Sequence, residues 1–317
     1  MALKLQCTAA PPGPRAHATP DALYSGLRPI VLFLAFCASL GAEYARVDTK
    51  SPVGEAFARM YNFDFPGAQA ILDREVSRDP QVPLPYAVKA AAHFFSELNR
   101  LKILQMDFFQ DDERVVDRRK LVPDQAVRSE IFRLIEAARQ RANQRLAADP
   151  GDRDSLFTLC MSAGLVTDYA ALVERKRLAS LSLAKHTQVY ALKLLALDPP
   201  YYDARLTSGS AEYVVGSLYF FVRWFIRIEG IEGSKQKGIE QLKTVAEHGK
   251  YYGPFARVLL SVIYLREKRP AEAETLLAGL VAEFPENPLF RRELVRAGEQ
   301  ARKNGARTIR ASAGSGE

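Results

Sequence analysis

The residue types that most often carry out chemistry are thinly spread in this chain of 317 residues. His93, His186 and His248 each stand without a second histidine, cysteine or carboxylate at the spacing of a zinc site. The glycine-containing segment 230–238 has neither the spacing of a phosphate-binding loop nor a strand before it. We therefore predict a protein that is not an enzyme, with no catalytic residue, no metal and no cofactor.

Two arginines are the strongest candidates for a binding role. Arg223 and Arg227 interrupt the aromatic segment 212–228, which we expect to form one helix. Because they are four residues apart, they would share one face of that helix. A pair of guanidinium groups flanked by Phe220 and Trp224 suits a carboxylate or an acidic peptide. In the structural alternative, the arginines pair with nearby acids and lay their stems along the aromatic rings.

The segment 252–289 shows which kind of element would position such a pair. It has the pattern of two short amphipathic helices joined by a tight turn, and its spacing matches a 34-residue helical repeat. Small side chains at Ser261 and Ala273 fall where the two helices must approach closely, and Pro285 ends the unit. One such unit cannot bury its own apolar faces, so several must stack.

The same pattern recurs in weaker form along the chain. Ala68 takes the place of Ala273 in an earlier unit, and strand signals are nearly absent. Three predicted helices each end at an Asp-Pro pair, at Asp79-Pro80, Asp149-Pro150 and Asp198-Pro199. We predict an all-α fold with about five degenerate helix pairs over residues 52–303 and a disordered tail at 304–317.

By these residues the chain resembles the tetratricopeptide-repeat (TPR) proteins. The segment 223–296 is similar to the C-terminal half of a group of exported bacterial TPR proteins. The resemblance implies a right-handed solenoid of stacked antiparallel helix pairs that binds a protein or peptide in its concave groove, without catalysis.

The repeat register predicts which residues line that groove. Aligning Gly238 with Ala273 places Arg223 and Arg227 at the positions of Val258 and Val262, which face the groove in TPR arrays. The expected groove residues are Phe220, Arg223, Arg227, Phe255, Val258, Val262 and Arg266.

The N-terminus has the features of a leader, at residues 1–42. Its apolar core, 29–40, is short for a membrane span, follows Arg28 and precedes small residues. We expect an exported protein of the periplasm or cell envelope, with an uncleaved N-terminal anchor as the alternative. If the leader is removed, Cys160 is the one remaining cysteine, so no internal disulfide can form.

The distribution of charge favours a protein-binding function over a nucleic-acid-binding one. The net charge is +7, but basic and acidic residues alternate along the predicted helices, which favours a solvated surface over a nucleic-acid site. Our first hypothesis is a scaffold that binds a partner protein or peptide, with an acidic partner favoured. The alternative is an apolar-ligand carrier or membrane-peripheral protein that uses the aromatic helix 213–228.

Overall fold

The regular secondary structure of this protein is helical wherever the structure describes it. The computed structural model describes residues 44–104, 121–218, 228 and 230–313, without the side chains of 177, 178, 181 and 306–313. Within these residues lie eleven α-helices, one π-helical turn, one 3-10 turn and no strand. The predicted all-α fold is confirmed.

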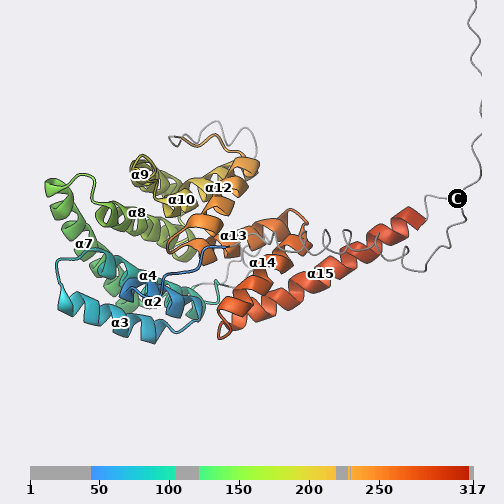
Figure 1. Cartoon of the computed structure of the whole chain (residues 1–317), viewed down its shortest axis with the longest axis horizontal. Helices are drawn as coiled ribbons and strands as arrows, with labels where there is room; N and C mark the ends of the chain where they lie inside the picture. Colours follow the sequence, from blue (N-terminus) through green and yellow to red (C-terminus); the bar gives the residue numbers. More distant parts are fainter. Residues whose placement is uncertain (1–43, 105–120, 219–227, 229, 314–317) are drawn as a thin grey trace, which may run out of the picture. The chain divides into compact units, whose positions relative to one another are not determined.

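The helices pack in the order of the sequence, each against the next (Figure 1). They form five consecutive pairs, followed by α15, which packs on α14. The pairs are α2 (Pro52–Tyr61) with α3 (Phe65–Arg78), α4 (Leu84–Arg100) with α7 (Gln125–Ala148), α8 (Arg153–Asp168) with α9 (Arg177–Leu195), α10 (Arg205–Ser217) with α12 (Lys235–His248), and α13 (Gly253–Arg266) with α14 (Pro270–Glu283). α15 spans Pro288–Ala313, the π-helical turn is Tyr169–Val173, and the 3-10 turn is Tyr202–Ala204.

Helix boundaries follow capping residues and prolines. The N-cap side chains of Ser51, Asp64, Asp124, Asp152 and Ser234 each accept a hydrogen bond from a backbone amide in the first turn. All three predicted Asp-Pro boundaries are confirmed: α3, α7 and α9 each end one to three residues before the aspartate.

Small residues lie where paired helices cross, as the repeat spacing predicts. Ala68, Ser261 and Ala273 have no exposed surface. A Cβ added to Gly238 would lie 2.7 Å from both the carbonyl oxygen of Gly209 and the amide nitrogen of Tyr213. The backbones of α10 and α12 therefore meet at a distance that only glycine permits at this position.

Two apolar clusters form the core. The first lies between α2, α3, α4, α7, α8 and α9 and includes Phe94, Phe157 and Tyr169. The second lies between α10, α12, α13, α14 and α15 and includes Leu242, Leu260 and Leu277. Each cluster spans several consecutive helices, as stacked units require.

The first helix pair also contacts the last one, which the sequence pattern does not predict. The Tyr61 hydroxyl donates to the carbonyl oxygen of Tyr251 at 2.9 Å, and the Asn287 side-chain amide donates to the carbonyl oxygen of Tyr61 at 2.7 Å. The Tyr61 and Phe284 rings lie 5.2 Å apart. Upstream, the Ala45 amide donates to the carbonyl oxygen of Ala246 at 2.9 Å. We call the contacts between Tyr61, Tyr251, Phe284 and Asn287 the closure contact.

Two expected boundaries differ from the structure. The segment 212–228 is not one helix, because α10 ends at Ser217 and Leu218 is extended. The loop before α12 crosses there: a Cβ on Gly216 would lie 2.7 Å from the amide nitrogen of Lys235. At the other end, α15 continues through Ala313, past residue 304, where we expected disorder to begin.

One helical stretch among the described residues is long and apolar enough to cross a membrane. It is Arg153–Val173, which contains an 18-residue window with a mean hydropathy of 1.6, and 61% of that window is buried. It comprises α8 and the π-helical turn, and α8 packs against α4, α7 and α9. Those contacts are the ones expected of a core helix in a stacked array.

Candidate functional site

The first turn of α13 is held in place by a buried carboxylate. Asp203, which is 1% exposed, accepts hydrogen bonds from the backbone amides of Lys250, Tyr251 and Tyr252 at 2.7, 2.8 and 2.6 Å. Burial raises the pKa of Asp203, while the three amides act in the opposite direction. These bonds fix two tyrosines at the junction between α12 and α13.

Those tyrosines join an aromatic cluster that connects three parts of the array. The ring of Tyr251 stacks on Phe57 of α2 at 4.9 Å and on Phe157 of α8 at 5.7 Å. Phe157 also stacks on Tyr201 at 4.9 Å and lies 5.4 Å from Tyr252. Offset and edge-on aromatic pairs of this kind contribute to stability beyond their buried area, so the cluster helps to hold these three parts together.

Part of the cluster remains accessible to solvent. Phe95 of α4 meets Phe255 of α13 edge-on with ring centres 5.7 Å apart, and Tyr252 lies 6.5 Å from Phe255. All three side chains are half-buried. We call Phe95, Tyr252 and Phe255 the inner aromatic surface. It brings together two helices that are far apart in the sequence, and large aromatic side chains are the commonest anchors of protein interfaces.

The described members of the predicted groove lie on one face of α13. Phe255 belongs to the inner aromatic surface, and the half-buried Val258 and Val262 pack against the second core cluster. Arg266 is half-buried and lies near Tyr213 and Glu267. The spacing of these four residues is that of one helical stripe.

The other three predicted groove residues are Phe220, Arg223 and Arg227, and they lie outside the described residues. The prediction that Arg223 and Arg227 occupy the positions of Val258 and Val262 assumed that one helix through residue 228 pairs with α12. The helix that packs on α12 is α10, which ends at Ser217.

A second carboxylate, Glu212 of α10, holds the loop before α12. It has no exposed surface and accepts from the backbone amides of Glu232, Gly233 and Ser234 at 3.1, 2.7 and 2.9 Å. Lys237 completes the set with an ion pair at 3.0 Å. Burial opposes ionisation of Glu212, but the amides and Lys237 outweigh it and lower its pKa.

Neither Asp203 nor Glu212 appears among the sequence-based candidates. The only signal in the sequence is an acidic residue within an apolar pattern, as in Glu212-Tyr213-Val214-Val215. A buried acid of this kind needs several donors, and here the loop amides supply them.

Asp168 is a third acid of interest, at the end of α8 beside the π-helical turn. Its side chain is accessible to solvent, yet the surrounding protein desolvates it and raises its pKa to about 7. Burial is the main cause of the raised pKa of Tyr252, and Asp168 is close enough to that phenol to add a smaller effect in the same direction. Asp168 therefore places an ionisable group near the inner aromatic surface.

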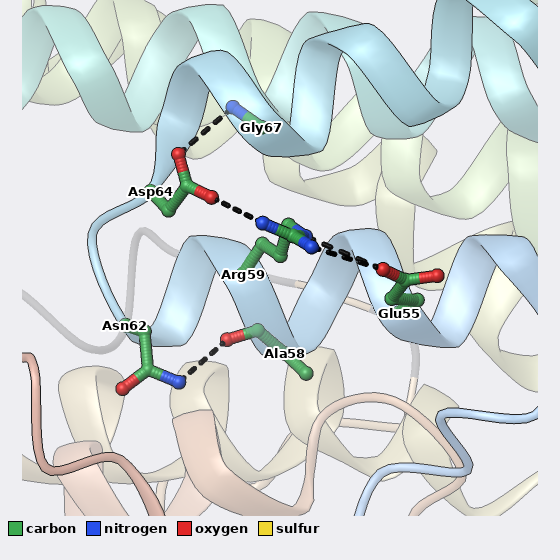
Figure 2. Close-up of polar contacts among 6 residues, drawn as sticks. All are labelled: Glu55, Ala58, Arg59, Asn62, Asp64 and Gly67. Carbon is green, nitrogen blue, oxygen red and sulfur yellow. Dashed lines mark hydrogen bonds and ion pairs between the residues drawn. The ribbon is translucent and has the colours of Figure 1, made fainter.

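A shallow pocket of about 280 Å³ lies where α2 meets the loop after α14. Its lining residues are Glu55, Ala58, Arg59, Asn62, Asp64, Pro285 and Glu286. Figure 2 shows Arg59 between two carboxylates, at 3.3 Å from Glu55 and 2.7 Å from Asp64. The bond from Arg59, followed by that from the Gly67 amide, lowers the pKa of Asp64. Arg59 and the two carboxylates are thus already paired with one another, so we do not propose the pocket as a binding or catalytic site.

Cys160 is buried in the structure. Burial raises the pKa of Cys160 to about 12, which keeps it a neutral thiol. Across the described parts of the chain, no three His, Cys, Asp or Glu side chains lie close enough to hold a metal ion. No family model, curated protein or solved structure matches this sequence.

Proposed function

We propose that this protein is a non-enzymatic scaffold that binds a partner protein or peptide along the α13 face and the inner aromatic surface. The observation that carries the proposal is the pairing of Phe95 with Phe255. Two helices separated by more than a hundred residues present accessible aromatic rings side by side. Half-buried rings on a rigid support lose little conformational entropy when a partner covers them.

The same proposal includes the finer description of the fold. We infer that the stacked pairs form a right-handed, TPR-like solenoid, in which α13 contributes Phe255, Val258, Val262 and Arg266 to the concave side. The small residues Ser261 and Ala273 at the α13–α14 crossing, and the stacking in sequence order, support this interpretation. An exported location, from the leader at 1–42, remains part of the proposal.

The experiment is a capture assay followed by a binding measurement. Wild-type protein is used to recover partners from envelope fractions, and any candidate is then purified and titrated against wild type and against Phe95→Ser/Phe255→Ser. We expect the double variant to weaken binding at least about tenfold, because interface aromatics commonly contribute more than 1 kcal/mol each. Val295→Ser, at an exposed position of α15, is the matched control.

The circular dichroism spectrum of each variant establishes that it is folded. A folded double variant that binds the purified partner as tightly as wild type would exclude the inner aromatic surface as the binding site. The alternative carrier function depended on one continuous aromatic helix at 213–228, whereas α10 ends at Ser217.

A further inference from the structure

Asp168 differs from the other acids of the array in having no partner. Asp203 and Glu212 each accept three hydrogen bonds from backbone amides. Within the described part of the chain, the Asp168 carboxylate has neither a hydrogen bond nor an ion pair. Its side chain is nevertheless accessible to solvent. An ionised Asp168 would therefore gain free energy from an external cation.

The direction of the helices decides which way Asp168 faces. Glu97, near the end of α4, accepts a hydrogen bond at 2.9 Å from the amide of Asp124, the N-cap of α7. The short link 149–152 then joins the end of α7 to the start of α8. Each of these connections reverses the direction of the chain. Since α4 and α8 also contact each other, they are neighbouring parallel helices.

Asp168 and Phe95 lie on the same side of this parallel pair. The rings of Phe94 on α4 and Tyr169 at the end of α8 are 6.1 Å apart, which marks where the two helices meet. Both helices turn by about 100° per residue in the same sense. The residue after the contact on one helix and the residue before it on the other therefore project to one side. Those residues are Phe95 and Asp168.

The rest of the inner aromatic surface lies on that side too. The Phe255 ring is 5.7 Å from that of Phe95. Phe157 precedes Asp168 by eleven residues, which brings both to one face of α8 to within about 20°. The Phe157 ring is 5.4 Å from that of Tyr252. The unpaired carboxylate thus faces the same space as the accessible aromatic rings.

The local backbone at Asp168 is also unusual. A π-helical turn, Tyr169–Val173, begins directly after this residue. Such turns are rare, and they occur frequently at functional sites. An unpaired carboxylate that the surrounding protein desolvates lowers the stability of the fold, and costs of this kind are commonly found where a group serves binding.

We propose that Asp168, together with the inner aromatic surface, binds one basic side chain of the partner segment. This inference rests on the proposed function and adds the chemistry of the partner. A cation can form charge-assisted hydrogen bonds with the carboxylate while the faces of nearby aromatic rings attract it. Arginine fits best, because its planar guanidinium can bond to a carboxylate and stack on a ring at once.

The first test is a selection of peptides from a random 12-residue library displayed on phage. It is carried out at pH 8 on the full-length wild type, Asp168→Asn and Phe95→Ser/Phe255→Ser. The matched control is Glu299→Gln, which removes an exposed acid on α15. We expect arginine and lysine to be enriched on wild type and on the control, but not on Asp168→Asn. The net charge of +7 opposes nonspecific binding of basic peptides, so such enrichment would report a specific site.

The second test measures the coupling between the two charges. A selected peptide is synthesised with its arginine and with citrulline, which has nearly the same shape but no charge. Each is titrated against wild type and Asp168→Asn. Either replacement alone should weaken binding roughly tenfold, as removal of one partner of a charge-assisted pair does. The two replacements together should weaken it little more than one, since they remove the same interaction.

The outcomes separate this inference from the proposed function. Peptides that depend on Phe95 and Phe255 but show no basic enrichment, or that bind Asp168→Asn as tightly as wild type, would overturn the inference alone. Enrichment of aspartate and glutamate would do the same, in favour of the acidic partner expected from Arg223 and Arg227. Peptides that bind Phe95→Ser/Phe255→Ser undiminished, or a selection that yields none, would overturn the proposed function and this inference with it.

Discussion

Replacing Glu212 with Gln tests whether a single buried carboxylate holds α10, α12 and the loop between them together. Glutamine keeps the shape of the side chain but replaces one carboxylate oxygen with an amide group that cannot accept. In wild type, one oxygen accepts from Gly233 and Ser234 and the other from Glu232 and Lys237. Whichever way the glutamine turns, two donors lose their acceptor.

The magnitude follows from these contacts. Hydrogen bonds to a charged group contribute about 1.5–3 kcal/mol each, and leaving one partner of a buried pair unmatched adds a desolvation cost. Lys237 is 37% exposed and can turn to water, which reduces the loss on its side. We therefore expect Glu212→Gln to lower the free energy of unfolding by about 2–4 kcal/mol at pH 7.5, measured by urea denaturation with circular dichroism.

The control is Glu232→Gln in the same loop. Glu232 pairs with the same lysine at 3.2 Å, but its side chain is 77% exposed, so we expect a change below about 0.5 kcal/mol. A Glu212→Gln variant as stable as this control would refute the argument that the carboxylate organises the loop.

The pH dependence gives a second check with a definite sign. The pKa of Glu212 is lower in the folded protein than its ordinary value of 4.5, so its contribution is complete above that value and is lost as the pH falls through the folded-state pKa. Wild type should therefore lose more stability than Glu212→Gln between pH 5 and pH 3. Equal losses would contradict the assignment.

Three further predictions concern packing, closure and the acid near the inner aromatic surface. Ala273→Leu should cost about 1–3 kcal/mol in a thermal or chemical melt, because the site is fully buried at a helix crossing, whereas the exposed Ala271→Leu should change little. Asn287→Ala should lower the free energy of unfolding by about 1–3 kcal/mol, because it removes the N-terminal cap of α15 and the hydrogen bond to Tyr61. It should also speed amide hydrogen exchange at the end of α2, and unchanged exchange there would show that the closure contact is dispensable. Asp168→Asn should raise the free energy of unfolding at pH 8 by on the order of 1 kcal/mol; this figure is kept small because the side chain is solvent-accessible. At pH 4 the same substitution should change the stability little. Because the pKa of Asp168 is raised to about 7, the wild-type carboxylate destabilises the fold increasingly as the pH rises from the ordinary pKa of an aspartate to about pH 7. A stabilisation by Asp168→Asn that shrinks with rising pH would contradict this prediction.

The local features of this fold could be predicted from the sequence, because they depend on short-range constraints. Proline cannot continue a helix, so each Asp-Pro step marks a true boundary. Close helix crossings demand small side chains, so the repeat spacing by itself places Ala68, Gly238 and Ala273 at the crossings. The stacking of helix pairs follows from apolar faces that no single pair can bury.

The tertiary structure alone decided where the long-range contacts form. The end of α10 at Ser217 depends on a loop that crosses it, which no pattern within 212–228 reveals. Asp203 and Glu212 become organising residues only because loop amides converge on them in space. Phe95 meets Phe255, and Tyr61 meets Asn287, through the accumulated geometry of five stacked pairs. Small rotations at each crossing add up along the array, and a sequence pattern that specifies each crossing separately does not determine their sum.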